Sequence, residues 1–289
     1  MDDILIKYTD DTSRFVVIDG TLVHYRDEGQ GFPLVLLHGA FSSLHTFDAW
    51  TAALKSNFRI IRYDLPGLGL TGPHASSDYS MRGHIRLLGK LLDMLKIDRC
   101  VLGGSSLGGW ISWEFALRHP KRIRKLVLLD AAGFLDEGSI PLAFKMARVP
   151  FAERVVRMVV RRNVLEQFIK EVYADMTKVT PELVDRYYEL FSREGNPDAF
   201  MQMVNRTPFI DNTAQLQKIQ PPTLIIWGEE DRWIPVENAH RFLNSIPRAR
   251  LVIYEGVGHL PMEEAPLDTA DELRRFIQGG GEQSNLFYD

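Results

Sequence analysis

A serine between a predicted buried strand and a predicted helix constrains this chain most. Ser106 lies in Gly104-Ser105-Ser106-Leu107-Gly108, after the apolar run Cys100–Gly103 and before the helical run Gly109–Leu117. The chain must reverse so sharply here that the serine takes a strained backbone conformation, and bulk at either flanking glycine would collide with the strand or the helix. The hydroxyl is then held at the positive end of a helix, where a developing oxyanion is favoured. The pattern Gly-x-Ser-x-Gly is common in loops, but in this strand-turn-helix setting it is typical of a nucleophile elbow.

Apolar runs that alternate with helical patterns predict an α/β fold. The runs are short and end at small or polar residues, as expected of strands that are buried on both faces. They are 33–37, 58–63, 100–103, 125–130, 223–227 and 250–254. Two earlier segments, 14–18 and 22–25, flank the hairpin turn signal Asp19-Gly20. Strands that alternate with helices predict a mostly parallel sheet with helices on both faces.

The alternation stops after Asp130. From about residue 134 to about residue 216 the chain shows only helical patterns, rich in arginine and methionine, such as the run 151–160. Such an interruption is best explained by a helical cap inserted after the sixth strand. The predicted organisation is an α/β core at 1–133 and 217–278, a helical cap at 134–216, and a flexible tail at 279–289 that starts with three glycines.

Composition argues against several classes of function. The 289 residues carry a net charge of −4, which gives no electrostatic basis for binding nucleic acid. No apolar run approaches the length of a membrane span, and the acidic start Met1–Leu5 lacks the features of a secretory signal. The single cysteine, Cys100, cannot form an internal disulfide, which permits an intracellular setting. We therefore expect a soluble cytoplasmic protein. No cluster of histidine, cysteine or carboxylate residues has metal-ligand spacing, so we expect no metal or other cofactor.

A serine hydroxyl needs a neighbouring base, and the base needs a third group that orients it. Of the eight histidines, His259 is the best candidate, because its glycine-containing loop follows the predicted strand at 250–254. Loops at the carboxyl ends of parallel strands meet at one edge of the sheet, so His259 is expected near Ser106. A surface histidine without a catalytic role is the simpler alternative, but it fits this placement less well.

Two aspartates compete for the role of the orienting acid. Asp231 lies in a longer loop after the strand at 223–227 and gives the chain order Ser, Asp, His that is expected for such a fold. Asp130 directly ends the strand at 125–130, where it more plausibly caps or braces the next loop. We therefore predict Asp231 as the acid.

Stabilisation of an oxyanion requires two backbone N–H groups. Leu107, directly after the nucleophile, is expected to supply one of them. Ala40, in the loop that follows the strand at 33–37, is expected to supply the other, because Gly39 lets the backbone approach closely. His38, in the same loop, is expected to form a hydrogen bond within that loop rather than to act as the base.

Residues that contact the substrate are less distinct in the sequence. Phe41 and Trp110 are candidates for lining the pocket, but both could equally be packing residues. The arginines of the predicted cap could meet an acidic substrate, although a solvated helix face balanced by glutamates is the more common explanation. Methionines in or near the cap would suit a pocket that accepts varied acyl groups.

Together these motifs resemble the α/β-hydrolase superfamily over nearly the whole chain outside the cap and the tail. The resemblance implies an eight-stranded sheet, a catalytic triad and a helical cap that forms the upper wall of the pocket. It is strongest for bacterial esterases and lipases, haloperoxidase-like enzymes and carbon–carbon bond hydrolases, although Ser105 stands where many relatives carry a larger polar residue. A serine at the elbow argues against epoxide hydrolases and haloalkane dehalogenases. The motifs that carry the resemblance are His38-Gly39, Asp64–Gly69, the elbow at Ser106, the Asp231 loop and Gly258-His259.

The resulting hypothesis is a serine hydrolase of carboxylic esters with Ser106 as nucleophile, His259 as general base and Asp231 as the orienting acid. The expected partner is a small to medium-sized, fairly apolar ester. One alternative is a carbon–carbon bond hydrolase of dienoate or diketone ring-fission products, which would use the same triad and a cationic cap residue for the substrate acid. Another is a slow ligand sensor that signals through its cap, since fold alone never settles function.

Overall fold

The core is a single twisted sheet in which the third and fourth strands are exchanged relative to their order along the chain. In the computed structural model, residues 3–134, 161–206, 212–279 and 286–288 are described. The sheet has the order β1-β2-β4-β3-β5-β6-β7-β8-β9. Pairs β1/β2 and β2/β4 are antiparallel and all others are parallel. The strands are β1 Ser13–Ile18, β2 Thr21–Glu28, β3 Phe32–Leu37, β4 Phe58–Tyr63, β5 Cys100–Ser105, β6 Ile123–Leu129, β7 Thr223–Gly228, β8 Ala249–Tyr254 and β9 Leu286–Tyr288.

The mostly parallel sheet predicted from the apolar runs is confirmed, and its first eight strands lie where the runs predict them. The ninth strand, β9, was not predicted. It extends the sheet at the β8 edge through parallel pairing, Val252 opposite Leu286. It falls within 279–289, the predicted flexible tail, most of which lies outside the described residues.

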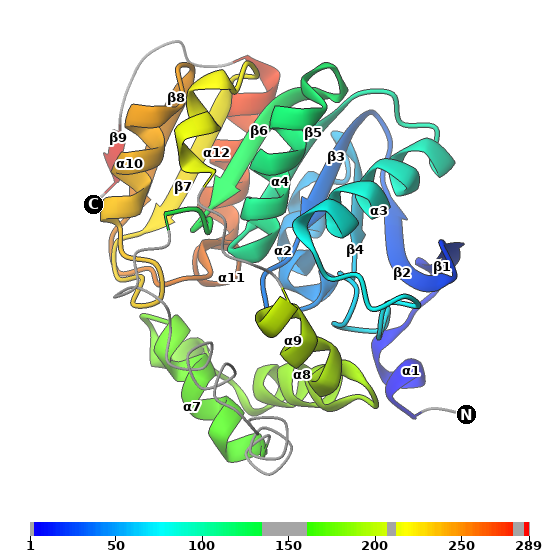
Figure 1. Cartoon of the computed structure of the whole chain (residues 1–289). Helices are drawn as coiled ribbons and strands as arrows, with labels where there is room; N and C mark the ends of the chain where they lie inside the picture. The colour runs from blue at the N-terminus through cyan, green and yellow to red at the C-terminus, as the bar shows by residue number, and fades with distance from the viewer. Residues whose placement is uncertain (1–2, 135–160, 207–211, 280–285, 289) are drawn as a thin grey trace.

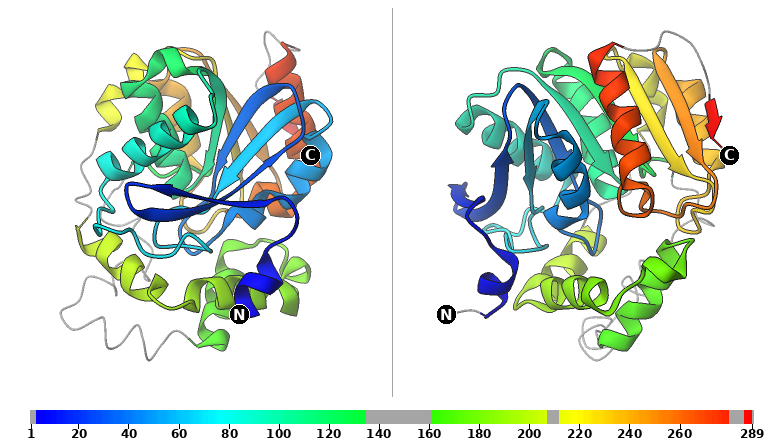
Figure 2. Two further views of the ribbon diagram at one scale, coloured as in Figure 1. Left: turned by 90° about the vertical axis from the view of Figure 1, so that its right-hand side faces the viewer. Right: turned by 180° about the vertical axis from the view of Figure 1, so that it is seen from behind.

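Helices cover both faces of the sheet, because buried strands need an apolar layer on each side. On one face lie α3 (Met81–Met94), α4 (Leu107–Arg118) and α10 (Glu237–Ser245), and on the other α2 (Asp48–Leu54), α11 (Pro261–Glu264) and α12 (Pro266–Gln278), as Figures 1 and 2 show. Alternate residues of one strand enter different clusters: in β3, Val35 and Leu37 join the core under α3 and α4, and Leu34 and Leu36 join the core under α2 and α12.

In the described residues between β6 and β7, three α-helices lie over the carboxyl ends of the strands (Figure 1). They are α7 (Arg162–Val172), α8 (Pro181–Ser192) and α9 (Asn196–Arg206), and we call them the cap helices. Their apolar faces join both cores: Leu165 and Ile169 extend the α2–α12 core, whereas Phe191 and Phe200 extend the α3–α4 core. The helical run predicted at 151–160 lies outside the described residues. No helix in the described parts of the chain is long and apolar enough to cross a membrane.

The chain begins with an unpredicted helix, α1 (Asp3–Tyr8), which packs against the cap helix α8. The Tyr8 hydroxyl donates to the Glu189 carboxylate at 2.7 Å, and the Lys7 ammonium lies 2.8 Å from the same group. Tyr8 also packs with Leu70 and Leu190 in a small apolar cluster. Helix α1 is therefore attached to the cap.

The loop after β4 is organised by one buried carboxylate, Asp64. Its oxygens accept hydrogen bonds from the Leu44 N–H at 2.7 Å, the Leu70 N–H at 2.8 Å and His24 Nδ1 at 2.8 Å. Burial opposes ionisation, but the hydrogen bond from His24 and the neighbouring histidines outweigh it and hold the pKa of Asp64 below its usual range. The motif Asp64–Gly69 is thus a turn built around a buried charge beside the cap.

Replacing Asp64 by asparagine should destabilise the fold. Both carboxylate oxygens of Asp64 accept hydrogen bonds, whereas an amide has only one oxygen. Its N–H₂ group would face at least one of the present donors and leave that buried donor unpaired. We expect the free energy of unfolding to fall by roughly 2–4 kcal/mol, measured by urea denaturation. Asp271→Asn on the exposed face of α12 is the matched control and should leave the midpoint nearly unchanged. Equal midpoints for the two variants would contradict the role given to Asp64.

Candidate active site

The turn between β5 and α4 has the geometry of a nucleophile elbow. Ser106 has φ +52° and ψ −115°, a conformation that L-residues rarely adopt. Its N–H donates to the Leu129 carbonyl at 3.0 Å, and its carbonyl accepts from the N–H groups of Trp110 and Ala132, each at 3.0 Å. The strained residue is therefore held by backbone bonds to β6, the β6 loop and α4.

The two glycines around the serine are required by close backbone contacts. A Cβ on Gly108 would lie 2.2 Å from the Leu37 carbonyl oxygen, and a Cβ on Gly104 would lie 2.2 Å from the Gly108 carbonyl oxygen. Both distances are far shorter than any real carbon–oxygen contact. The spacing Gly-x-Ser-x-Gly thus follows from α4 crossing directly over the ends of β3 and β5.

His259 and Asp231 form a buried pair at the same edge of the sheet. His259 Nδ1 lies 2.7 Å from Asp231 Oδ2. Asp231 Oδ1 accepts from the N–H groups of Trp233 at 2.8 Å and Ile234 at 3.0 Å, so a tight turn after β7 holds the carboxylate. With Nδ1 bound to the acid, Nε2 is the nitrogen left for a proton from another group.

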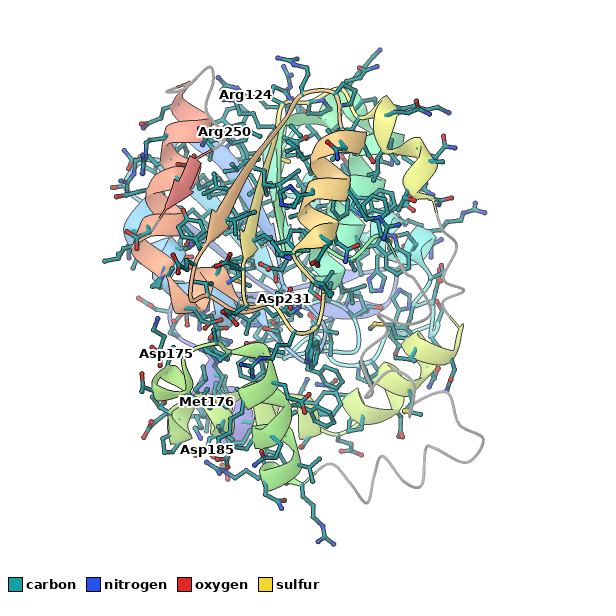
Figure 3. All side chains as sticks on the ribbon, turned by 90° about the vertical axis from the view of Figure 1, so that its left-hand side faces the viewer. Arg124, Asp175, Met176, Asp185, Asp231 and Arg250 are labelled. Atoms are coloured by element: carbon teal, nitrogen blue, oxygen red, sulfur yellow. The ribbon has the colours of Figure 1, made fainter. Side chains whose placement is uncertain are left out.

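Ser106 and His259 line the same cavity, which opens between the sheet and the cap helices. Figure 3 shows Asp231 at this junction, with Asp175, Met176 and Asp185 of the cap on one side and Arg124 and Arg250 at the far end of the sheet. The structure therefore brings the three predicted triad residues to one place. An alcohol, an imidazole and a carboxylate arranged in this order can activate the alcohol as a nucleophile.

The competing acid, Asp130, lies beside this pair without hydrogen bonding to His259 in the described structure. It follows β6 with φ +43°, is fully buried, and its Oδ1 accepts the Gly228 N–H at 3.0 Å. Ligand atoms of Asp130, Asp231 and His259 lie within 4.8 Å of one another, close enough in principle to hold a cation. His259 and Asp231 of this group are also bonded directly to each other.

The two predicted oxyanion donors lie on either side of Ser106. Leu107 is the first residue of α4, so its N–H is one of those without a partner inside the helix. Ala40 lines the cavity, and the preceding Gly39 lies so close that a Cβ there would be 3.1 Å from the Ser106 Cβ. His38 behaves as the sequence predicts: Nδ1 binds the Gly39 carbonyl at 2.8 Å and Nε2 accepts the Leu65 N–H at 3.0 Å.

Of the two predicted pocket residues, the structure brings only Phe41 to the cavity. Phe41 has φ +61° and packs on Phe200 and Phe191 of the cap, with ring centroids 4.3 and 4.9 Å away. Trp110 does not line the cavity in the described structure and lies in the core under α3 and α4. A sequence pattern around Ser106 does not reveal whether Trp110 lines the cavity or packs in this core.

Most of the cavity wall was not predicted from the sequence. The cap side is apolar and comes mainly from α7, whose residues 165, 168, 169 and 172 repeat at helical spacing and could have been recognised as one face. Among the described lining residues none carries a positive charge. The lining comprises Gly39, Ala40, Phe41, Ser42, Ser106, Leu165, Phe168, Ile169, Val172, Tyr187, Trp233, His259 and Leu260.

The segment that carries His259 is bound to the cap by two successive glutamates. Glu263 accepts hydrogen bonds from the hydroxyls of Tyr173 at 2.7 Å and Tyr187 at 2.8 Å, and from Arg186 at 2.8 Å. Glu264 accepts from the Ala174 N–H at 2.8 Å.

Two backbone N–H groups of the loop that carries His259 also form hydrogen bonds. The N–H of His259 donates to the Val172 carbonyl at 2.7 Å, and the N–H of Gly258 donates to Glu264 at 2.8 Å. The position of the base is therefore set jointly by the sheet and the cap helices.

A model of the α/β hydrolase fold family matches residues 33–266 of the sequence. The chain belongs to the α/β-hydrolase family. The resemblance seen in the sequence motifs is thus confirmed, and the chain is a hydrolase by family.

Several known proteins are similar over almost the whole chain. The uncharacterized hydrolase YugF of Bacillus subtilis is 30% identical, over 92% of this chain and 97% of its own. A 2-hydroxy-6-oxo-2,4-heptadienoate hydrolase of Pseudomonas putida is 30% identical, over 85% and 89%. A crystal structure of a meta-cleavage product hydrolase, CumD, superimposes with a TM-score of 0.80 at 23% identity, over 93% and 98%. The fold is thus shared with a solved meta-cleavage product hydrolase.

The close contact at Gly108 predicts a large effect of one methyl group. Gly108→Ala would push a Cβ into the Leu37 carbonyl, and we expect it to destabilise the fold by more than about 3 kcal/mol or to prevent folding. Gly89→Ala on α3 is the matched control, because the nearest atom to its Cβ would belong to Phe115, at 3.9 Å. It should stabilise the chain by about 0.5–1 kcal/mol. Urea denaturation measures both, and similar behaviour of the two variants would rule out the close contact as the reason for the glycine.

Proposed function

We propose that this chain is a serine hydrolase of neutral, fairly apolar carboxylic esters. His259 takes the proton of Ser106 as the serine oxygen attacks the ester carbonyl. The bond between the carbonyl carbon and the alcohol oxygen then breaks, His259 gives its proton to that oxygen, and the alcohol leaves the acyl-enzyme. Water then attacks the acyl group with His259 again as base, which releases the carboxylic acid. The N–H groups of Ala40 and Leu107 stabilise the oxyanion, each worth on the order of 3 kcal/mol.

The apolar cap wall carries the choice of substrate. Leu165, Phe168, Ile169 and Val172 offer no partner for a charged group, and no described lining residue is cationic. Arg186, the cationic cap residue nearest in sequence to the lining residue Tyr187, is paired with Glu263 at 2.8 Å. A substrate that carries a carboxylate into this cavity would lose its hydration without gaining a counter-charge, which is costly.

Carbon–carbon bond hydrolysis of a dienoate ring-fission product is the second candidate. Most of the relatives with a named reaction favour it over ester hydrolysis. The Pseudomonas putida relative is a 2-hydroxy-6-oxo-2,4-heptadienoate hydrolase, and the CumD structure is that of a meta-cleavage product hydrolase. The same triad serves both reactions. The two candidates differ in the substrate carboxylate, which the ester does not have.

Removing the nucleophile should abolish either reaction. We expect Ser106→Ala to lower kcat by roughly 10³- to 10⁶-fold, because the hydroxyl forms the covalent bond. Ser56→Ala, on the exposed turn before β4, is the matched serine control and should retain parent activity. Turnover of p-nitrophenyl acetate and butyrate checks both variants. Parent-like rates in Ser106→Ala would exclude a serine mechanism.

Paired substrates decide between the two candidates. A panel of neutral p-nitrophenyl esters of graded acyl length should be hydrolysed with a kcat/KM at least about 10-fold higher than a 2-hydroxy-6-oxo-dienoate, because the dienoate carboxylate has no counter-charge in the described cavity wall. Initial rates by absorbance, at equal ionic strength, give the comparison. A preference for the dienoate would replace ester hydrolysis by carbon–carbon bond hydrolysis as the function.

A further inference from the structure

A second buried carboxyl group lies beside the triad, and the reaction as described does not use it. Asp130 is fully buried at the end of β6. One of its oxygens, Oδ1, accepts the Gly228 N–H at 3.0 Å. No N–H or O–H of the described residues donates to the other oxygen, Oδ2. A buried carboxylate oxygen without a donor is costly if the group is ionised.

The neighbouring carboxyl group, that of Asp231, accepts more hydrogen bonds. Its Oδ1 accepts from the N–H groups of Trp233 and Ile234, and its Oδ2 is bonded to the ring nitrogen of His259, at 2.7–3.0 Å. Three donors stabilise its negative charge, whereas Asp130 has one. Two adjacent buried carboxyl groups cannot both ionise cheaply, so the proton belongs to the group with fewer donors.

We propose that Asp130 is a neutral carboxylic acid that donates its proton in a hydrogen bond to the Asp231 carboxylate, and that it acts as a positioning residue of the triad. The inference rests on the proposed triad of Ser106, His259 and Asp231 and deepens it. Burial and the nearby Asp231 charge both raise the pKa of Asp130, and Glu264 adds to this from α11. The groups that face Asp130 are thus the Asp231 and Glu264 carboxyls, His259 and the Gly228 N–H.

This hydrogen bond has a defined effect on the base. A donor on Asp231 withdraws negative charge from the carboxylate, so the carboxylate stabilises a protonated His259 less. His259 is then free to accept the Ser106 proton at lower pH. The bond also restrains rotation of the Asp231 side chain and so helps to aim the imidazole.

The backbone at Asp130 allows a conservative test. Its φ of +43° is one that asparagine tolerates well. In Asp130→Asn, the amide N–H₂ can donate to Asp231 while the amide oxygen still accepts the Gly228 N–H. The variant therefore imitates the neutral acid, but differs by one full charge from an ionised Asp130. Asp130→Ala removes the donor altogether.

The experiment measures inactivation of the full chain by an alkyl fluorophosphonate as a function of pH. Ser106 Oγ bonds to phosphorus, fluoride leaves and His259 takes the proton, so the rate needs no knowledge of the natural substrate. We expect the inactivation rate of Asp130→Asn to fall at acidic pH as it does in the parent. In Asp130→Ala, this acidic limb of the pH profile should move to higher pH by roughly half to one unit. An acidic limb that moves to lower pH in Asp130→Asn means that Asp130 was ionised, and overturns the proposal. So do unshifted limbs in both variants, whatever their overall rates.

Two further measurements keep the outcomes separate. If the parent Ser106 is not labelled by the fluorophosphonate, as judged by peptide mapping, the proposed function fails before Asp130 is tested. If Asp130→Ala does not fold, the infrared spectrum at neutral pH decides. The C=O stretch of a protonated carboxyl group should be present in the parent and reduced in Asp130→Asn. An unchanged band would overturn the proposal.

Discussion

The close crossing of α4 over the ends of β3 and β5 is the constraint on which the rest of the site depends. At this crossing the Leu37 carbonyl and the backbone of Gly104 and Gly108 leave no space for a single additional carbon. The strain of Ser106 is the result, and it is held by backbone bonds to β6 and the loop after it. Because β3 and β5 are neighbours in the sheet, the same crossing brings the Gly39–Ala40 backbone next to the serine. Nucleophile and predicted oxyanion donors are thus set by one packing contact.

The proposed base, His259, is held differently from the proposed nucleophile, Ser106. Ser106 is held by backbone bonds to β6, the loop after it and α4, whereas the loop of His259 is bonded to Val172 and, through Glu263 and Glu264, to Tyr173, Tyr187 and Ala174. The geometry between serine and histidine therefore depends on how the cap helices sit on the core. This arrangement gives the cap a part in aligning the reacting groups, in addition to forming the wall of the cavity.

Much of the fold and the site could be predicted from the sequence because the relevant signals are local. A continuous apolar run identifies a buried strand, and the rule that strand carboxyl ends share one edge brings Ser106, Asp231 and His259 together. To place Trp110, a prediction needs to know which side of α4 faces the sheet. The almost uniformly apolar sequence of α4 does not specify this. The pairing of β9 with β8 is a long-range contact with no local pattern. The proximity of Asp130 to Asp231 likewise depends on the neighbouring register of β6 and β7.

The docking of α1 on the cap has a consequence for how the protein is handled. Tyr8 and Lys7 of α1 bind Glu189 of α8. Tyr187, two residues earlier on α8, lines the cavity. The outer wall of the pocket is thus braced by the first few residues of the polypeptide. A purification tag fused directly before Asp3, or removal of α1, would therefore act on the wall of this cavity. A tag at the opposite terminus would act at the β8 edge of the sheet, where β9 pairs, instead of at this brace.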